Sequence, residues 1–141
     1  MRKTLLAIAT VVTLLCAVSI SYAEHGYIWN LPTRYSYTRL VSAGLYIEGN
    51  TATCTGKGRG IYGTTTTCIT VSLQRRQSNN DTWHTVSSWE DTASGTNTAS
   101  VYETVTVSSG YNYRVCVRCQ IEGSDGGVLE TVFKYSSIWS L

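Results

Sequence analysis

Two cysteines stand three residues apart, Cys116 and Cys119, inside the alternating apolar run YRVCVRC. A C-x-x-C pair is typical of a redox couple, whose first thiol sits at a helix N-terminus, or of half a zinc site, where the thiolates converge. Here the alternation predicts a strand, with Cys119 on the inner face and Cys116 on the outer face. Residues three apart in a strand are about 10 Å from each other, beyond the roughly 7 Å limit between the Cα atoms of a disulfide. We expect no redox couple, no zinc site and no bond between these two cysteines.

No other motif predicts catalysis or a cofactor. The two histidines are His25 and His84, and the sequence has no nucleophile elbow, no H-E-x-x-H and no recognisable pair of acids. The stretch GKGRGIYG, residues 56–63, is rich in glycine, and we interpret it as a mobile loop. It lacks the residue order of a phosphate-binding loop, and no helix start follows it. The sequence therefore predicts a non-enzymatic protein with no catalytic residue, metal or cofactor.

Aromatic and basic residues form the candidate ligand surface. Exposed rings can stack on sugars, and outward arginines on neighbouring strands can make a local basic patch. The candidates are Trp83, Trp89, Tyr62, Arg76, Arg114 and Arg118, with Tyr102 and Tyr111 as further rings. The competing interpretation is structural, and we favour it. In that interpretation the two tryptophans fill the core, and the arginines pair with Glu130 on a solvated face.

The chain is organised as an export signal, a short arm and one domain. Residues 1–23 begin with the basic Arg2 and Lys3 and continue with an apolar stretch, which predicts a signal peptide. Residues 24–34 have no hydrophobic period and predict an arm, and residues 35–141 are enough for one domain. Lys and Arg number 11 and Asp and Glu number 9, so the loss of two basic residues with the signal leaves a neutral chain. We expect a secreted protein that binds neither nucleic acid nor, after cleavage, a membrane.

After residue 24 the sequence predicts an all-β fold. It is rich in Thr, Val and Tyr and shows no sustained 3.6-residue apolar period. The run CITVSLQRR alternates cleanly, with Ile69, Val71 and Leu73 on one face. Trp83, Val86 and Trp89 are spaced three apart, which a regular strand cannot place on one face, so we expect a bulge or a bend there. About seven short strands predict a two-sheet antiparallel β-sandwich of immunoglobulin or fibronectin type III kind.

The stretch VSSGYNYRVCV, residues 107–117, resembles the fibronectin type III pattern of an apolar residue, a glycine turn and a tyrosine that opens an alternating strand. In that family the tyrosine hydroxyl bonds to backbone upstream as a tyrosine corner, and Tyr113 is the matching residue. The family's proline before the glycine is Ser109 here. More broadly, residues 35–137 resemble small, uncharacterised exported proteins of Gram-positive bacteria with one such sandwich. This resemblance implies the fold and the location, and it implies no activity.

The immunoglobulin-like fold also implies a pairing for the cysteines. Its second and sixth strands lie in opposite sheets, which suits a bridge from Cys54 to the inward Cys119. Its third and sixth strands are neighbours in one sheet, which suits Cys68 with the outward Cys116. We predict the disulfides 54–119 and 68–116, while two other connectivities and the fully reduced state stay open.

Three hypotheses of function follow. The leading one is a secreted, non-enzymatic binding module that recognises a surface glycan or protein through a sheet face or the glycine-rich stretch. The second is a small secreted antagonist, an inhibitor or a bacteriocin-like toxin, with which export and short length are compatible. The third is a hydrolase, which requires His84 or a pair of acids in a cleft. The sequence gives no preference for an oligomeric state.

Overall fold

Eight β-strands build residues 35–141, the part of the chain that the computed structural model describes. They are β1 (Thr38–Glu48), β2 (Thr51–Gly60), β3 (Thr66–Arg76), β4 (His84–Ser94), β5 (Ala99–Thr106), β6 (Asn112–Glu122), β7 (Val128–Tyr135) and β8 (Trp139–Ser140). None of the described residues belongs to a helix that is long and apolar enough to span a membrane. The predicted signal peptide, residues 1–23, and the predicted arm, residues 24–34, lie outside the described residues.

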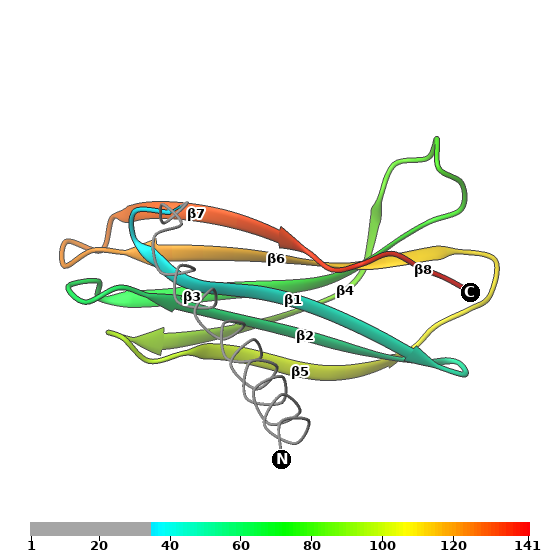
Figure 1. Cartoon of the computed structure of the whole chain (residues 1–141), viewed down its shortest axis with the longest axis horizontal. Coiled ribbons are helices and arrows are strands. Elements are labelled where there is room, and N and C mark those ends of the chain that lie inside the picture. The colour runs from blue at the N-terminus through cyan, green and yellow to red at the C-terminus, as the bar shows by residue number, and fades with distance from the viewer. Residues whose placement is uncertain (1–34) are drawn as a thin grey trace, which may run out of the picture. The chain divides into compact units, whose positions relative to one another are not determined.

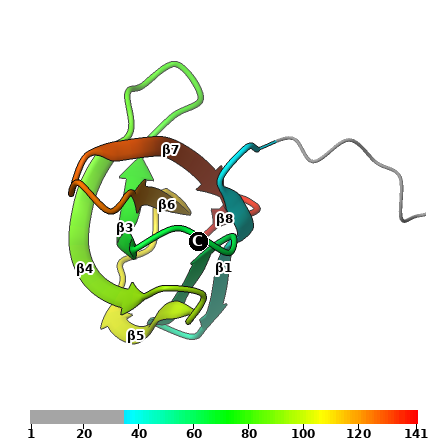
Figure 2. The ribbon, with the colours of Figure 1, turned by 90° about the vertical axis from the view of Figure 1, so that its left-hand side faces the viewer.

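The strands form two antiparallel sheets that face each other (Figure 1 and Figure 2). One sheet has the order β1-β2-β5, and the other has the order β4-β3-β6-β7, with the short β8 pairing with the start of β6. The core lies between the sheets and includes Ala52, Val71, Val115 and Val117, each with no exposed surface. The predicted all-β fold of two antiparallel sheets is confirmed, and its arrangement is β-sandwich-like.

Strand alternation sets which side chains enter the core. In β3, Ile69, Val71 and Leu73 are at most 1% exposed, whereas the side chains between them face outward. The β3–β4 register shifts between Leu73 and Gln74, where Val86 is the extra residue of β4. This shift is a bulge of the kind predicted from the three-residue spacing of Trp83, Val86 and Trp89.

The second strand is longer than predicted, because its glycines belong to the sheet. The inner face of β2 carries only small residues, among them Gly56 and Gly58. A Cβ on Gly56 would lie 2.4 Å from Cγ2 of Val71, and a Cβ on Gly58 would lie 2.5 Å from Cγ2 of Ile69. Carbon atoms in contact are about 3.5–4.0 Å apart, so the facing sheet leaves no space for a side chain here. The prediction of a loop is wrong for residues 56–60, because β2 continues to Gly60, and only residues 61–63 of the predicted stretch lie in a loop.

A carboxylate bridges the two sheets at each open edge. At one edge, Glu130 of β7 accepts the hydroxyl hydrogen of Thr38 at 2.7 Å and two backbone N–H groups just before β1, at 2.9 and 3.0 Å. At the other edge, Oδ2 of Asp91 on β4 accepts the backbone N–H of Ser100 on β5 at 2.7 Å. Each of the two carboxylates therefore joins the two sheets, and together they hold the two layers in register.

Cys68 and Cys116 are free thiols, and the sheet register keeps them apart. Cys68 lies opposite Gln120, and Cys116 lies opposite Ser72. Four positions along the ladder therefore separate the two cysteines, which is roughly 13 Å. The predicted disulfide 68–116 is wrong.

Cys54 and Cys119 are also free and buried. Both face the core, as predicted, but Cys119 faces Gly58, whose Cβ position lies 2.8 Å from its Sγ. Gly58 lies four residues along β2 from Cys54, so the two sulfur atoms sit at different levels of the core. The predicted disulfide 54–119 is therefore also wrong. Strand parity predicts which face of the sheet a residue lies on, but it does not predict the position of that residue along the strand.

Candidate functional site

Four side chains stack in a row on the outer face of the sheet β4-β3-β6-β7. The Cζ atom of Arg76 lies 4.5 Å from the ring centre of Trp83, and that of Arg114 lies 4.3 Å from the same ring. The Arg114 Cζ also lies 4.3 Å from the ring centre of Tyr135. We call Arg76, Trp83, Arg114 and Tyr135 the arginine–aromatic ladder. Trp83 thus lies between two guanidinium groups, and each cation–π contact at an exposed site contributes about 0.5–1 kcal/mol.

The strands position the ladder arginines, and hydrogen bonds hold them. Arg114 of β6 donates from Nε to Oε1 of Gln74 on the neighbouring β3, at 2.9 Å. Arg76, at the end of β3, donates to the backbone oxygen and to Oδ1 of Asn79 at 3.1 and 2.9 Å. Within residues 35–141 neither arginine has a carboxylate partner, so both positive charges are uncompensated. The prediction that Glu130 pairs with these arginines is wrong, because Glu130 bonds to the start of β1.

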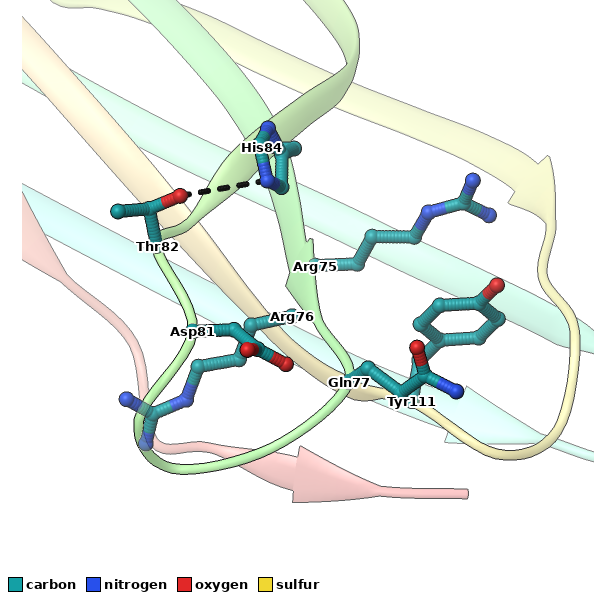
Figure 3. Close-up of a pocket in the computed structure, with 7 residues that line it drawn as sticks. All are labelled: Arg75, Arg76, Gln77, Asp81, Thr82, His84 and Tyr111. Atoms are coloured by element: carbon teal, nitrogen blue, oxygen red, sulfur yellow. Dashed lines mark hydrogen bonds between the residues drawn. The ribbon is translucent and has the colours of Figure 1, made fainter.

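A pocket of about 350 Å³ lies beside the ladder, at the elbow where the chain passes from β3 to β4 (Figure 3). Its lining residues are Arg75, Arg76, Gln77, Asp81, Thr82, His84 and Tyr111. In Figure 3, Arg75 and Tyr111 stand on one side, and Thr82 and Asp81, which belong to the loop, stand on the other. The Arg75 Cζ atom lies 4.4 Å from the ring centre of Tyr111.

Hydrogen bonds also fix the loop that forms one wall of the pocket. The backbone N–H of Ser78 donates to Oδ2 of Asp81 at 2.7 Å, and the backbone N–H of Asp81 donates to the Ser78 carbonyl at 3.2 Å. Oγ1 of Thr82 and Nε2 of His84 are 3.3 Å apart. Within the described residues no carboxylate bonds to the other ring nitrogen of His84, so the third member of a triad is not in place.

The opposite wall of the pocket rests on Tyr111, in the turn before β6. The Leu141 backbone N–H donates to the Tyr111 carbonyl at 3.0 Å, and the Tyr111 ring meets the Tyr113 ring edge-on, 6.3 Å between centres. Tyr113 itself is 1% exposed, and its hydroxyl donates to the Ser108 carbonyl at 2.9 Å and accepts the Ser108 backbone N–H at 3.0 Å. This is a bond to upstream backbone, of the type that the resemblance implied for Tyr113.

The structure divides the candidate surface that the sequence suggested. Arg76, Trp83 and Arg114 come together in the ladder, whereas Trp89 packs against the core from β4. Arg118 is exposed on the same sheet face and donates to Oγ1 of Thr70 at 3.4 Å. Tyr62 is 93% exposed in the loop after β2, which lies at the other end of β3 from the ladder.

Sequence reasoning missed three features of the site. Tyr135 completes the ladder, Arg75 points into the pocket, and Cys116 is buried although it faces outward. Burial raises the pKa of the Cys116 thiol, and a hydrogen bond with Tyr135 and the charge of Arg114 offset only part of that rise. The signal for Tyr135 was its outward parity on β7, opposite Cys116.

Metal binding finds no support in the described part of the chain. Residues 35–141 contain no group of three or more His, Cys, Asp or Glu side chains that could hold a metal ion. Cys68 is half-buried on the outer face, where its Sγ is 3.8 Å from Oε1 of Glu122 and 3.7 Å from Oγ1 of Thr92.

Comparison of the sequence with protein-family models finds no match, and comparison with curated proteins finds none either. Among solved structures, the chain is similar to Spo0M, a sporulation control protein from Bacillus subtilis, with a TM-score of 0.41 and 13% sequence identity. The similarity covers 72% of this chain and 49% of that one, so the chain spans about half the length of this neighbour. A likeness this distant says nothing about activity or partners.

Proposed function

We propose that the protein is an exported, non-enzymatic binding module of immunoglobulin or fibronectin type III kind, and that it binds an acidic surface polysaccharide on the outer face of the sheet β4-β3-β6-β7. The strand order supports this fold type, since three strands, β1-β2-β5, face four, β4-β3-β6-β7. The bonds between the Tyr113 hydroxyl and the Ser108 backbone support it as well.

The observation that carries the proposal is the arginine–aromatic ladder. It presents two positive charges that have no carboxylate partner within residues 35–141, next to two aromatic rings. A guanidinium group forms two parallel hydrogen bonds with a carboxylate, and the exposed ring of Tyr135, on which only Arg114 stacks among the described residues, can pack against the apolar face of a sugar. Because the stack already fixes these side chains, a ligand loses little free energy in ordering them.

The rest of the same face suits sugar hydroxyls. Along β3 and β4 it carries hydroxyl side chains, namely Thr70, Ser72, Ser88 and Thr92. Two of these, Ser72 and Ser88, lie 3.0 Å apart, and each hydroxyl can both donate and accept. A polymer that bears hydroxyls and carboxylates matches this surface better than a nucleic acid, since nucleic-acid binders typically neutralise about 6–10 phosphates.

The test is retention of the full-length exported protein on immobilised polygalacturonate, with dextran as the neutral polymer. We expect retention on polygalacturonate only, weakening as salt is added, because charge attraction is screened. Arg114→Gln should lower the affinity at least about tenfold, because a hydrogen bond to a charged group contributes about 1.5–3 kcal/mol and about 1.4 kcal/mol is a factor of ten.

Lys57→Gln is the matched control, since it removes one exposed positive charge from β2 in the other sheet. It should change the affinity less than about twofold, because a distant exposed charge contributes little. Equal retention on dextran, or an equal loss for Lys57→Gln and Arg114→Gln, would contradict the proposal.

A further inference from the structure

One residue that lines the pocket beside the ladder, Arg75, has a positively charged side chain whose hydrogen-bond donors are unused in the described part of the chain. Within residues 35–141, Arg75 makes no hydrogen bond and no ion pair, and its guanidinium stacks on the Tyr111 ring. Gln77, on the same lining, also makes no side-chain hydrogen bond in this part of the chain. A guanidinium has five N–H donors in a planar fork, which matches the two oxygens of a carboxylate.

The ring on which Arg75 stacks and the opposite wall of the pocket are fixed before any ligand arrives. Its platform, Tyr111, is fixed through its backbone by Leu141 and through its ring by the buried Tyr113. On the opposite wall, Asp81 is fixed by two bonds to Ser78. A site whose walls are fixed in this way recognises a ligand by its shape as well as by its charge.

Asp81 determines which kind of anion fits. The pocket has two arginines and one aspartate, so its net charge is only weakly positive. A small, multiply charged anion such as phosphate would approach the Asp81 carboxylate and be repelled. A sugar that bears one carboxylate can instead turn its acid group to Arg75 and its hydroxyls to Asp81 and Thr82, since a carboxylate accepts hydrogen bonds from hydroxyls.

We infer that this pocket binds one uronic-acid unit of the polymer, with the carboxylate on Arg75 and the ring hydroxyls on Asp81 and Thr82 (Figure 3). The volume of about 350 Å³ lies at the small end of the range for ligand pockets, which is roughly 300–1,000 Å³. The inference rests on the proposed function and adds to it the unit that is recognised and the residues that recognise it.

The experiment titrates the ¹⁵N-labelled full chain with tri-galacturonic acid and follows the backbone amide resonances. Maltotriose is the neutral probe, a sulfated trisaccharide tests the acid group, and sodium sulfate is the simple anion. We expect shifts for residues 75–84 and for Tyr111 with tri-galacturonic acid, and much smaller ones with the other three. Arg75→Gln should weaken binding at least tenfold, whereas Lys57→Gln, which removes one exposed positive charge from β2 in the other sheet, should change it less than twofold.

Asp81→Asn supplies a second readout. An asparagine oxygen can still accept the Ser78 N–H, so the loop should keep its shape. The variant should bind tri-galacturonic acid several-fold more weakly and sodium sulfate more tightly, two opposite changes that a loss of folding cannot produce.

The failures of the two proposals can be told apart. If polygalacturonate retains the protein but Arg75→Gln changes nothing, the pocket assignment is wrong and the binding module stands. Tighter binding of the sulfated trisaccharide or of sodium sulfate than of tri-galacturonic acid also overturns the uronic-acid assignment. If no acidic polymer retains the protein, the proposed function itself fails.

Discussion

Replacing Gly56 by alanine tests the close approach of the two sheets. The added Cβ would lie 2.4 Å from Cγ2 of Val71 and 2.9 Å from Cγ2 of Val117. Both valines are fully buried, so neither methyl group can turn away into solvent. The substitution therefore adds one carbon where the core has no space for it.

The expected loss follows from two opposing effects. In a strand, alanine is favoured over glycine by about 0.5–1 kcal/mol, because the unfolded chain of glycine has more conformational freedom. Overpacking a filled core costs about 1–3 kcal/mol, and two contacts this short place Gly56→Ala at the upper end of that range. We expect a net loss of about 2 kcal/mol in the free energy of unfolding. For a domain of about 100 residues this lowers the Tm by roughly 8–16 °C.

Urea unfolding of the full chain, followed by tryptophan fluorescence, measures this loss. Gly127→Ala is the matched control, because its Cβ would meet only the flexible Asp125 carboxylate, at 3.2 Å, and it should change stability by less than about 0.5 kcal/mol. The double variant Gly56→Ala/Val71→Ala should lose less than the sum of the two single variants, since Val71→Ala removes the methyl group that is hit. A Gly56→Ala protein as stable as the parent, or more stable, would refute the argument.

Two further predictions concern titratable groups. Burial alone would raise the pKa of the Glu130 carboxyl. The hydrogen bonds that the carboxylate accepts lower the pKa by more than burial raises it, so the net pKa lies below the ordinary value of 4.5. Its bonds therefore stabilise the fold above about pH 4.5 and are lost as the pH falls through the lowered pKa. Glu130→Gln should cost about 1–2 kcal/mol at pH 7, with the difference closing in acid in urea unfolding curves, whereas the exposed Glu90→Gln should cost little; a gap that stays constant down to pH 3 would contradict this. Burial raises the pKa of Cys54 and Cys119 from 9.0 to about 11, which lowers their thiolate fraction about a hundredfold. Iodoacetamide at pH 8, with peptide mass spectrometry, should label the half-buried Cys68 first and the other two only after unfolding, and equal labelling of all three in the folded protein would disprove the assignment.

Much of the fold could be predicted from the sequence, because alternation reports directly which face a side chain takes. The inward positions of β3 and the inward Cys119 follow from parity alone. The length of β2 could not be predicted, since glycines in a strand look like a loop until the opposite sheet is in place. In the structure, Gly56 and Gly58 meet Val71, Ile69 and Cys119 across the core, contacts that no local pattern encodes.

The cysteine pairing shows the same limit in another form. Parity placed Cys54 and Cys119 on facing inner surfaces and Cys68 and Cys116 on one outer surface, and all four placements agree with the strands. The level of each cysteine along its strand depends on register, which is set by turns and by long-range pairing. A shift of four positions was enough to separate Cys68 from Cys116.

The candidate site depends on strand parity, which the sequence predicts, and on strand register, which it does not. Arg75 and Arg76 are consecutive residues at the end of β3, so their side chains leave the strand on opposite sides. Arg76 therefore joins the ladder on the outer face, whereas Arg75 turns to the side of Tyr113 and lines the pocket. The loop that follows serves both, because it supplies Trp83 to the ladder and Asp81 to the pocket.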